Sequence, residues 1–570
     1  MSDRTTSERF TGDFPRRTAI KTLGMSATVG LAGCGEQEDG EENVEDADPD
    51  ETDSSSFDLI EASIPEIHEA MAEGDLTAES LTQQYLDRID AYDEDLNAIL
   101  YINDDAIERA QELDERLDAS DPAGPLHGIP LLLKDNFNTG DMPTTGGSKT
   151  LEGVVPPEDA TTVEKFREAG AIVLGKANMH EFAYGWETYS SMGGQTPEPY
   201  TGEHVSGGSS GGSAASVAAN LTAVATGSDT CGSNRVPPAF TNTVGLRGTL
   251  GLISRNGIMP MSTAQDIAGP ITRTIVDQAI MLDVMVGYDP TDPSTARSVG
   301  NIPTEGSPPI TTEIDDETDP TDTYTESLDT DALDGATIGV VREYIEETEE
   351  GEPVANVMEA VIETMEDAGA EIVDPVSVPP DDNSVTGTEF RREMNRYLAA
   401  IDDPTAPETL EDIVADGENV HPNVLPTLEN NLEVEYEEFD ENVEYMQSLL
   451  KRDLYRDMTE VNNTPGNRQQ ILMEMADHDL DAILYPVASH PPTEIPEDEP
   501  ANQSGVNCTL SAGTGLPSLS IPGGFTDDGL PVGIELMGRP FDEELLLALG
   551  YSYEQEAEVR RPPEDFGPIN

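Results

Sequence analysis

An apolar run that ends in a lysine, followed by two glycine-rich segments that each carry a serine, constrains the fold of this chain most. Ile129 to Leu133 lead into Lys134, Ser209 stands in SGGSSGGSAAS, and Ser233 stands in GSDTCGSNRVPPAF. A serine hydroxyl becomes a strong nucleophile when a base removes its proton, and a neutral lysine can be that base. A buried strand that ends at Lys134 would lower the pKa of this side chain by desolvation. Together the three residues predict a serine hydrolase that needs no histidine.

Each segment taken alone has a simpler interpretation. A glycine-serine run such as the one around Ser209 is typical of a flexible linker, and a lone lysine is most often solvated. The helix-like AASVAAN at 214–220 and the strand-like LTAVATGS after it argue against a linker. A phosphate-binding loop is disfavoured because no Gly-Lys-Ser/Thr closes the run. The histidines form no metal-binding motif, so the sequence predicts neither a metal nor a cofactor.

The order of these segments resembles the amidase signature family, in which a Lys-Asp after a hydrophobic strand precedes GGSSGGS and then G-[ST]-D-x-x-G-S-x-R-x-P. Two serine motifs combined with the lysine are more specific than a single glycine-rich run. The resemblance covers roughly residues 57–560. Other segments also match the family pattern, namely GPLHGIPLLLKDNF (124–137), GAIVLGKANMHEFAYG (170–185), GPITRTIVDQAIMLDVMVGYDP (269–290) and GLPSLSIPGGF with the following GLPVGIELMGRPFDEELLL (515–547).

The resemblance implies a role for each polar residue of the two serine loops. Ser233 matches the nucleophile, Ser209 matches the serine that passes a proton between the nucleophile and the base, and Lys134 matches the base itself. The family forms its oxyanion hole from the backbone N–H groups at the positions of Thr230, Cys231, Gly232 and Ser233. Three more residues are expected to support these groups: Asp229, Arg235 and Ser210. The resemblance also implies a cis peptide bond between Gly208 and Ser209.

Cys231 and Asn234 depart from the family pattern, which usually has Gly-Gly-Ser-Ile-Arg here. A positive φ at position 231 would be strained with a cysteine. Cys231 is also an alternative nucleophile, although no histidine motif lies near it and Ser233 follows closely. Nothing in the sequence brings Cys231 and Cys508 together, so we expect both to be reduced thiols, with a disulfide as the alternative.

Alternating helical and strand-like patterns predict an α/β protein. Helix-like TTVEKFREAG precedes strand-like AIVLG, and the segments TIGVV, VANVMEAVIETMEDAGA and EIVD have the order of a βαβ unit. Residues 386–475 are predicted to be mainly helical. Length alone would suggest two or three domains, but the resemblance implies a single large one. Its fold would be the amidase-signature fold, a large mixed, mostly parallel sheet with helices on both faces.

The first residues predict export and membrane anchoring. PRRTAIK contains the pair Arg16 and Arg17, a short apolar stretch follows at 22–32, and LAGC ends at Cys34. This order is typical of a twin-arginine signal peptide, here residues 1–33, that ends in a lipobox. The stretch is too short to span a membrane, which takes about 20 residues. We therefore expect lipid on Cys34 to hold the protein on the outer face of the cytoplasmic membrane, with an ordinary disordered N-terminus as the alternative.

Acidic residues dominate the composition. Residues 34–56 are acidic and polar and are expected to form a disordered tether, before the amidase signature domain at 57–560 and a C-terminal tail at 561–570. The whole chain has 115 Asp and Glu against 29 Lys and Arg, a net charge of −86. Such charge opposes compaction unless salt screens it, and the Debye length falls to about 3 Å at 1 M salt. The composition therefore predicts a halophilic protein and disfavours nucleic acid as a partner.

Three functions are compatible with these features. The first is a lipid-anchored amidase that hydrolyses a carboxylic or peptide-like amide through an acyl-enzyme intermediate. The second is the glutamine-hydrolysing A subunit of a glutamyl/aspartyl-tRNA amidotransferase, which is disfavoured because charged tRNA stays in the cytosol. The third is a non-catalytic solute-binding lipoprotein, which is disfavoured because binding needs no Lys-Ser-Ser relay. We expect the first, with a small-molecule amide as substrate, and the sequence leaves the identity of the amide and the oligomeric state open.

Overall fold

The structure is a computed structural model that describes residues 57–303, 323–345, 348–379, 386–433, 467–496 and 500–569. The predicted signal peptide and tether, with Arg16, Arg17 and Cys34, lie outside the described residues. The described residues belong to one unit, which runs from Ser55 to Asn570. Among them, no helix combines the length and the apolar character that a membrane-spanning segment requires.

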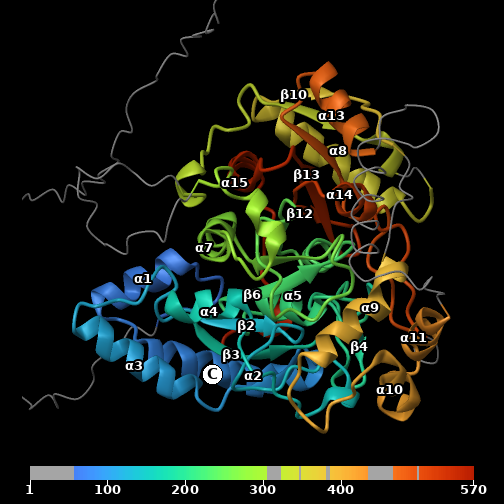
Figure 1. Cartoon of the computed structure of the whole chain (residues 1–570). Coiled ribbons are helices and arrows are strands. Elements are labelled where there is room, and N and C mark those ends of the chain that lie inside the picture. Colours follow the sequence, from blue (N-terminus) through green and yellow to red (C-terminus); the bar gives the residue numbers. More distant parts are fainter. Residues whose placement is uncertain are drawn as a thin grey trace, which may run out of the picture. The chain divides into compact units, whose positions relative to one another are not determined.

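An eleven-stranded sheet is the largest element among the described residues (Figure 1). Its strands lie in the order β1-β3-β2-β6-β8-β7-β12-β13-β11-β9-β10. Their bounds are β1 Ile99–Ile102, β2 Pro130–Lys134, β3 Ile172–Ala177, β6 Val224–Asp229, β7 Val244–Arg247, β8 Ile267–Thr272, β9 Thr337–Val340, β10 Glu371–Val373, β11 Ala482–Pro486, β12 Ser518–Phe525 and β13 Pro531–Met537. The short strands β4 Tyr189–Ser190 and β5 Gly194–Gln195 form a separate two-stranded sheet.

The sheet is mixed, as the sequence predicts, but parallel pairing is confined to its two flanks. β2 pairs in parallel with β3 and β6, and β9 pairs in parallel with β10 and β11. The other neighbouring pairs, including the central β6-β8-β7-β12-β13 series, are antiparallel. The expectation of a mostly parallel sheet therefore needs this correction. The physical reason is that the parallel flanks contain crossover helices, whereas β12 and β13 follow each other through a tight turn at Thr526 to Leu530.

Helices cover both faces of the sheet. α5 and α6 pack on β8, β7 and β12, and α7 and α15 pack on the same strands. The two pairs lie on opposite faces, since Leu519 of β12 packs against Gly550 of α15, whereas the next residue, Ser520, donates to the carbonyl of Arg235, which precedes α6. The α-helices are α1 Ile64–Glu73, α2 Ala78–Leu96, α3 Ala106–Asp118, α4 Thr161–Glu168, α5 Gly211–Ala218, α6 Val236–Phe240, α7 Ile275–Met285, α8 Glu352–Asp367, α9 Thr386–Ala399, α10 Leu410–Ala415, α11 Leu425–Leu432, α13 Asn467–Asp477, α14 Thr509–Thr514 and α15 Glu543–Ala557.

Local sequence explains several of these elements. The predicted βαβ unit forms as β9-α8-β10, with Ile338 opposite Ile372 in a parallel pair. α8 places Val354, Met358, Val361 and Met365 in the core at helical spacing. The predicted helical region contains α9, α10, α11 and α13, with residues 434–466 outside the described ones. α9 to α11 lie together beside the sheet (Figure 1).

The parallel pairing of β2 with β6 determines where the serine and lysine motifs meet. Leu131 pairs with Val224 and Leu132 with Ala225, so the carboxyl ends of these strands are neighbours. The Lys134 backbone N–H donates to Thr226 Oγ1 at 3.0 Å. The loop that contains Ser233 follows β6 directly. Polar groups at the carboxyl ends of adjacent parallel strands are a common location for active sites.

Candidate active site

Lys134 ends β2, a strand whose five residues are all buried. Its side chain has no exposed surface. Burial lowers the pKa of Lys134 to about 7, while Asp229 and Asp266 oppose this shift by favouring the charged form. The predicted strand and the predicted pKa shift are both confirmed. A substantial fraction of Lys134 is therefore neutral near pH 7.

Lys134 contacts two serines through its amine. Its Nζ lies 2.7 Å from Ser209 Oγ, 3.0 Å from Ser228 Oγ and 3.2 Å from the Ser228 carbonyl oxygen. A neutral amine has two N–H donors and one lone pair. When both donors point at the Ser228 oxygens, the lone pair faces the Ser209 hydroxyl and can accept its proton. Asn136 Nδ2 donates to Ser228 Oγ at 2.8 Å and so orients this second serine.

Ser209 lies in the loop that leads into α5. The Gly208–Ser209 peptide bond is cis, which confirms that prediction. The Ser209 carbonyl accepts the His180 backbone N–H at 3.0 Å. The adjacent Ser210 donates its hydroxyl to the Ser228 carbonyl at 3.4 Å, so it lies beside the lysine as expected. The glycines around Ser209 let three chain segments approach closely, since a Cβ at Gly208 would come 2.6 Å from the Gly185 carbonyl oxygen.

Ser233 follows Gly232 in the loop after β6 and is 5% exposed. Its hydroxyl has no hydrogen-bond partner among the described residues. Lys134 and Ser209 are thus joined by a hydrogen bond, whereas no hydrogen bond joins Ser209 to Ser233 among the described residues. Catalytic hydrogen bonds are often long in unliganded sites and shorten when substrate binds. The assignment of Ser233 as nucleophile stays a prediction.

The loop from Thr230 to Ser233 uses its backbone donors unequally. The Gly232 N–H donates to Asp229 Oδ1 at 2.8 Å, so in this structure it is not available to a substrate oxyanion. The N–H groups of Thr230, Cys231 and Ser233 have no acceptor among the described residues. The positive φ of this loop, 91°, falls on Gly232 and not on Cys231, so the cysteine causes no such strain. Three of the four predicted oxyanion donors are therefore free.

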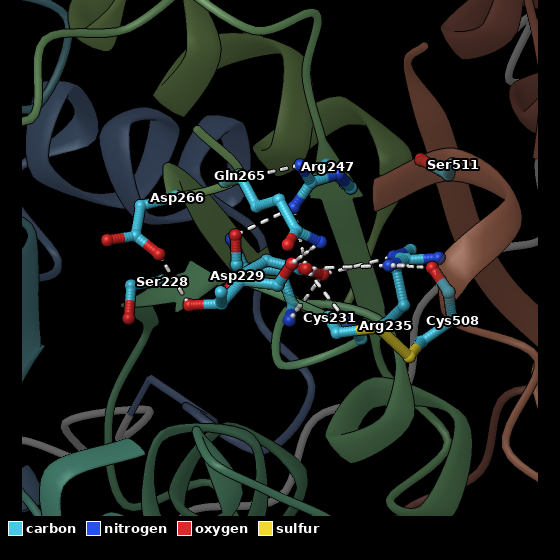
Figure 2. Close-up of polar contacts among 12 residues, drawn as sticks. Ser228, Asp229, Cys231, Arg235, Arg247, Gln265, Asp266, Cys508 and Ser511 are labelled. Carbon is cyan, nitrogen blue, oxygen red and sulfur yellow. Dashed lines mark hydrogen bonds and ion pairs between the residues drawn. A yellow bond between two sulfur atoms is a disulfide. The ribbon is translucent and has the colours of Figure 1, made fainter. Parts of the chain in front are cut away.

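Asp229 and Arg235 brace this loop, as predicted. Asp229 accepts the Asn234 N–H at 3.1 Å and Arg235 Nε at 3.0 Å, and Arg247 Nη1 lies 2.7 Å from its other oxygen. Burial alone would raise the pKa of Asp229, but the charges of Arg235 and Arg247 outweigh it and hold this pKa well below its usual range. Arg235 also pairs with Glu535 at 3.0 Å. Figure 2 shows the contacts that join Asp229 to both arginines. The loop is held by buried charges that are all paired.

Cys231 and Cys508 form a disulfide, which corrects the expectation that both are reduced (Figure 2). Their Cα atoms lie 5.2 Å apart although 277 positions separate them in the sequence. Cys508 precedes α14, and the fold brings the start of this helix beside the loop after β6. A sulfur in a disulfide is not a free thiolate, so the bond also removes Cys231 as an alternative nucleophile.

Sequence reasoning missed four residues of this site. Ser228 contacts Lys134 and is itself oriented by Asn136, Arg247 pairs with Asp229, and Trp186 Nε1 donates to the Cys231 carbonyl at 2.9 Å. Ser228 precedes Asp229 in the serine motif, and Asn136 follows Lys134 closely in the lysine motif. Their positions in the sequence could therefore have identified them as site residues. Arg247 and Trp186 carry no comparable signal.

A cavity of about 180 Å³ is lined in part by Ser228 and Thr230. Its apolar lining includes Ile258, Met259 and Met261. Its polar lining includes Asn136, whose Oδ1 is buried without a hydrogen-bond partner among the described residues. Asp266 is a further lining residue, and burial raises its pKa to about 6, although donors from Thr230, Met261 and Ser262 oppose this shift. The cavity thus combines apolar surface with acceptor atoms.

Comparison with known proteins identifies the family. The profile of the family described as Amidase matches residues 80–547. The chain belongs to the amidase family. Amidase relatives include the A subunit of the glutamyl-tRNA(Gln) amidotransferase from Thermosynechococcus vestitus, 33% identical over 515 residues, with 86% of this chain and 97% of that protein covered. Its counterpart from Methanosarcina barkeri is 34% identical over 511 residues, with 88% and 98% covered.

Solved amidase structures share this fold. The native peptide amidase from Stenotrophomonas maltophilia superposes with a TM-score of 0.74 at 34% identity and covers 88% of this chain and 98% of its own. An amidase family protein from Bacillus anthracis gives a TM-score of 0.74 at 29% identity, with 89% and 93% covered. The protein is therefore an amidohydrolase that cleaves C–N amide bonds.

Proposed function

We propose that this amidase is free-standing and hydrolyses linear, peptide-like carboxamides through an acyl-enzyme on Ser233. The contact that carries the proposal is the 2.7 Å hydrogen bond between a buried, partly neutral Lys134 and Ser209. It supplies the base that an uncharged serine nucleophile needs. No histidine is required for this chemistry, and burial lowers the pKa of the nearby His180 to about 3, so that His180 is neutral.

In the proposed mechanism, protons move along the two serines. Neutral Lys134 takes the Ser209 proton, Ser209 takes the Ser233 proton, and Ser233 Oγ attacks the amide carbonyl carbon. The free N–H groups of Cys231 and Ser233 donate to the oxyanion that forms. The proton then returns through Ser209 to the leaving amine, the C–N bond breaks, and the acyl group stays on Ser233. Water, deprotonated by the same relay, attacks the ester and releases the carboxylate.

Two observations support a peptide-like, uncharged acyl group. The Stenotrophomonas maltophilia relative is a peptide amidase and aligns over nearly its whole length. The cavity beside Ser228 offers apolar surface and the acceptor Asn136 Oδ1, and the guanidinium of its lining residue Arg255 is already paired with Asp292 at 2.8 Å. This lining suits a neutral group with an N–H donor better than a carboxylate. The test is hydrolysis of a panel of amides in high salt: C-terminally amidated dipeptides, simple aliphatic amides and free glutamine. A preference for glutamine would overturn this substrate class.

Glutamine hydrolysis for a tRNA amidotransferase is the second candidate, since the curated relatives named above are A subunits of such an enzyme. Because these relatives are parts of a larger enzyme, this candidate predicts glutaminase activity that rises sharply on co-expression with the other subunits. The free-standing amidase predicts full activity alone. The Cys231–Cys508 disulfide supports the latter, because disulfides are rare in the cytosol where tRNA is charged.

We further propose that the amidase is exported by the twin-arginine route and anchored through lipid on Cys34. The motif order around Arg16, Arg17 and Cys34 supports this, and so does the disulfide, which persists in oxidising compartments. Arg16→Lys with Arg17→Lys should leave active enzyme in the cytoplasm, because the paired arginines are the export signal. Cys34→Ser should instead block lipid attachment and release enzyme to the medium. Cell fractionation with activity assays measures both, and wild-type enzyme found wholly in the cytoplasm with an uncleaved N-terminus would contradict the proposal.

Salt dependence is the expected consequence of the net charge of −86. At about 0.1 M salt the Debye length is about 10 Å and surface carboxylates repel one another across the fold, whereas at about 1 M it is about 3 Å. The thermal unfolding midpoint should therefore rise steadily between these concentrations of KCl. Sucrose at equal osmolality is the control, because it screens no charge. An unfolding midpoint that is independent of KCl would refute a halophilic protein.

A further inference from the structure

The Cys231–Cys508 disulfide joins the loop with the free backbone donors to a distant part of the fold. Cys231 precedes Gly232 and Ser233 in this loop, and Cys508 is the residue before α14. Cys508 is 3% exposed. The crosslink therefore lies within the site and touches the segment that would hold the oxyanion.

The contacts of Cys231 leave only its N–H group free. Its carbonyl accepts Trp186 Nε1 at 2.9 Å, its sulfur is bonded to Cys508, and the next N–H, that of Gly232, donates to Asp229 at 2.8 Å. The side chain and the carbonyl are thus fixed from two directions. The Cys231 N–H belongs to the preceding planar peptide unit, whose Thr230 carbonyl accepts Gln265 Nε2 at 3.5 Å. The peptide units on both sides of the Cys231 Cα are therefore held, which sets the direction of this N–H.

The other end of the crosslink is a rigid anchor. The Cys508 carbonyl accepts Arg235 Nη2 at 3.0 Å, and the same arginine pairs with Asp229. The adjacent Asn507 donates its N–H to Val487 and its Nδ2 to Pro486, both at 2.9 Å, at the end of β11. Gly232 packs directly on this anchor, since a Cβ there would come 2.9 Å from Cys508 Cβ. Movement of the loop away from this anchor is prevented by the disulfide.

We propose that the Cys231–Cys508 disulfide positions the oxyanion donors, so that turnover depends on its being oxidised. The inference rests on the proposed roles of Ser233 and its loop. In the test, a dithiol reagent delivers two electrons and two protons to the disulfide, which yields two thiols while the reagent closes to a cyclic disulfide. The loop then keeps its hydrogen bonds to Trp186 and Asp229 but is no longer held to Cys508 by a covalent bond.

Loss of the crosslink should lower kcat more than it changes KM. The donors act mainly on charge that develops in the transition state, so their displacement leaves ground-state binding nearly intact. Removal of one oxyanion donor typically costs about 10²- to 10³-fold in kcat, and partial displacement should cost less, about tenfold. A purely structural disulfide would lower the unfolding temperature and leave kcat unchanged at temperatures where the protein is folded.

The experiment measures kcat and KM of oxidised, reduced and reoxidised enzyme in a Cys34→Ser background, which removes the third thiol. Near-ultraviolet circular dichroism reports the folded fraction. Fluorescence of Trp186, the single tryptophan of the chain, reports the loop itself because its indole N–H bonds to Cys231. Cys231→Ala with Cys508→Ala is the matched variant, which should have the low kcat of the reduced enzyme and be insensitive to the reagent.

The proposal holds if kcat falls on reduction, recovers on reoxidation and is low in the double variant. An unchanged kcat in folded, reduced enzyme overturns it, even if the unfolding temperature drops. If the double variant does not fold, the test rests on the kcat of the reduced wild-type enzyme, corrected for its measured folded fraction. Failure of the proposed function gives a different result, in which the oxidised enzyme is not labelled at Ser233 by a fluorophosphonate.

Discussion

Ser233→Ala is expected to abolish both amide hydrolysis and covalent labelling by a fluorophosphonate. Loss of a serine nucleophile typically costs about 10⁶-fold in kcat, because the acyl-enzyme can then no longer form on it. Ser209→Ala should be less severe, about 10²- to 10⁴-fold, since it interrupts proton transfer but keeps the nucleophile and the free donors of the loop. Steady-state hydrolysis and labelling rates on purified enzyme in high salt measure both effects.

Ser213→Ala is the matched control for these serine variants. Ser213 lies in α5, and its hydroxyl is buried without a hydrogen-bond partner among the described residues, so its removal should leave activity near that of the wild type. Full activity of Ser233→Ala would remove Ser233 from the mechanism. Loss of labelling in Ser209→Ala together with normal labelling of Ser233→Ala would exchange the roles of the two serines.

Lys134→Arg is expected to be nearly inactive at every pH at which the enzyme is folded. Arginine stays protonated in proteins and cannot accept the Ser209 proton, so the general-base contribution of about 10²- to 10⁴-fold is lost. Lys165→Arg is the matched control, because Lys165 donates to the carbonyls of Met285 and Val286 and lies outside the site. An active Lys134→Arg enzyme would rule out lysine as the base.

The wild-type pH profile tests the same assignment without a substitution. Burial lowers the pKa of Lys134 to about 7, and only the neutral amine is a base. As the pH falls below 7 the neutral fraction drops, so kcat/KM should decrease about tenfold per pH unit on the acidic side and level off above this pKa. A profile that is flat from pH 5 to pH 8, with the enzyme folded throughout, would contradict a neutral lysine.

Short-range patterns in the sequence were enough to locate most of the fold elements and the chemistry. The alternation of helix and strand predicted β9-α8-β10, and the apolar run before Lys134 predicted a buried strand with a lysine at its end. Both depend on residues close together in the chain, where hydrophobic periodicity and burial act locally. The family pattern then placed Ser209, Asp229 and Arg235 in positions where the structure finds their expected contacts.

Only the tertiary structure decided which distant residues meet. It joined Cys231 to Cys508, paired Arg235 with Glu535, and brought Trp186 to the Cys231 carbonyl. It also showed that Gly232 donates its N–H to Asp229, so that the predicted oxyanion hole has fewer free donors than the motif implies. The physical reason is that the sequence specifies local conformation and hydrophobic pattern, whereas crosslinks, ion pairs and donor directions depend on how strands and loops far apart in the chain pack against one another.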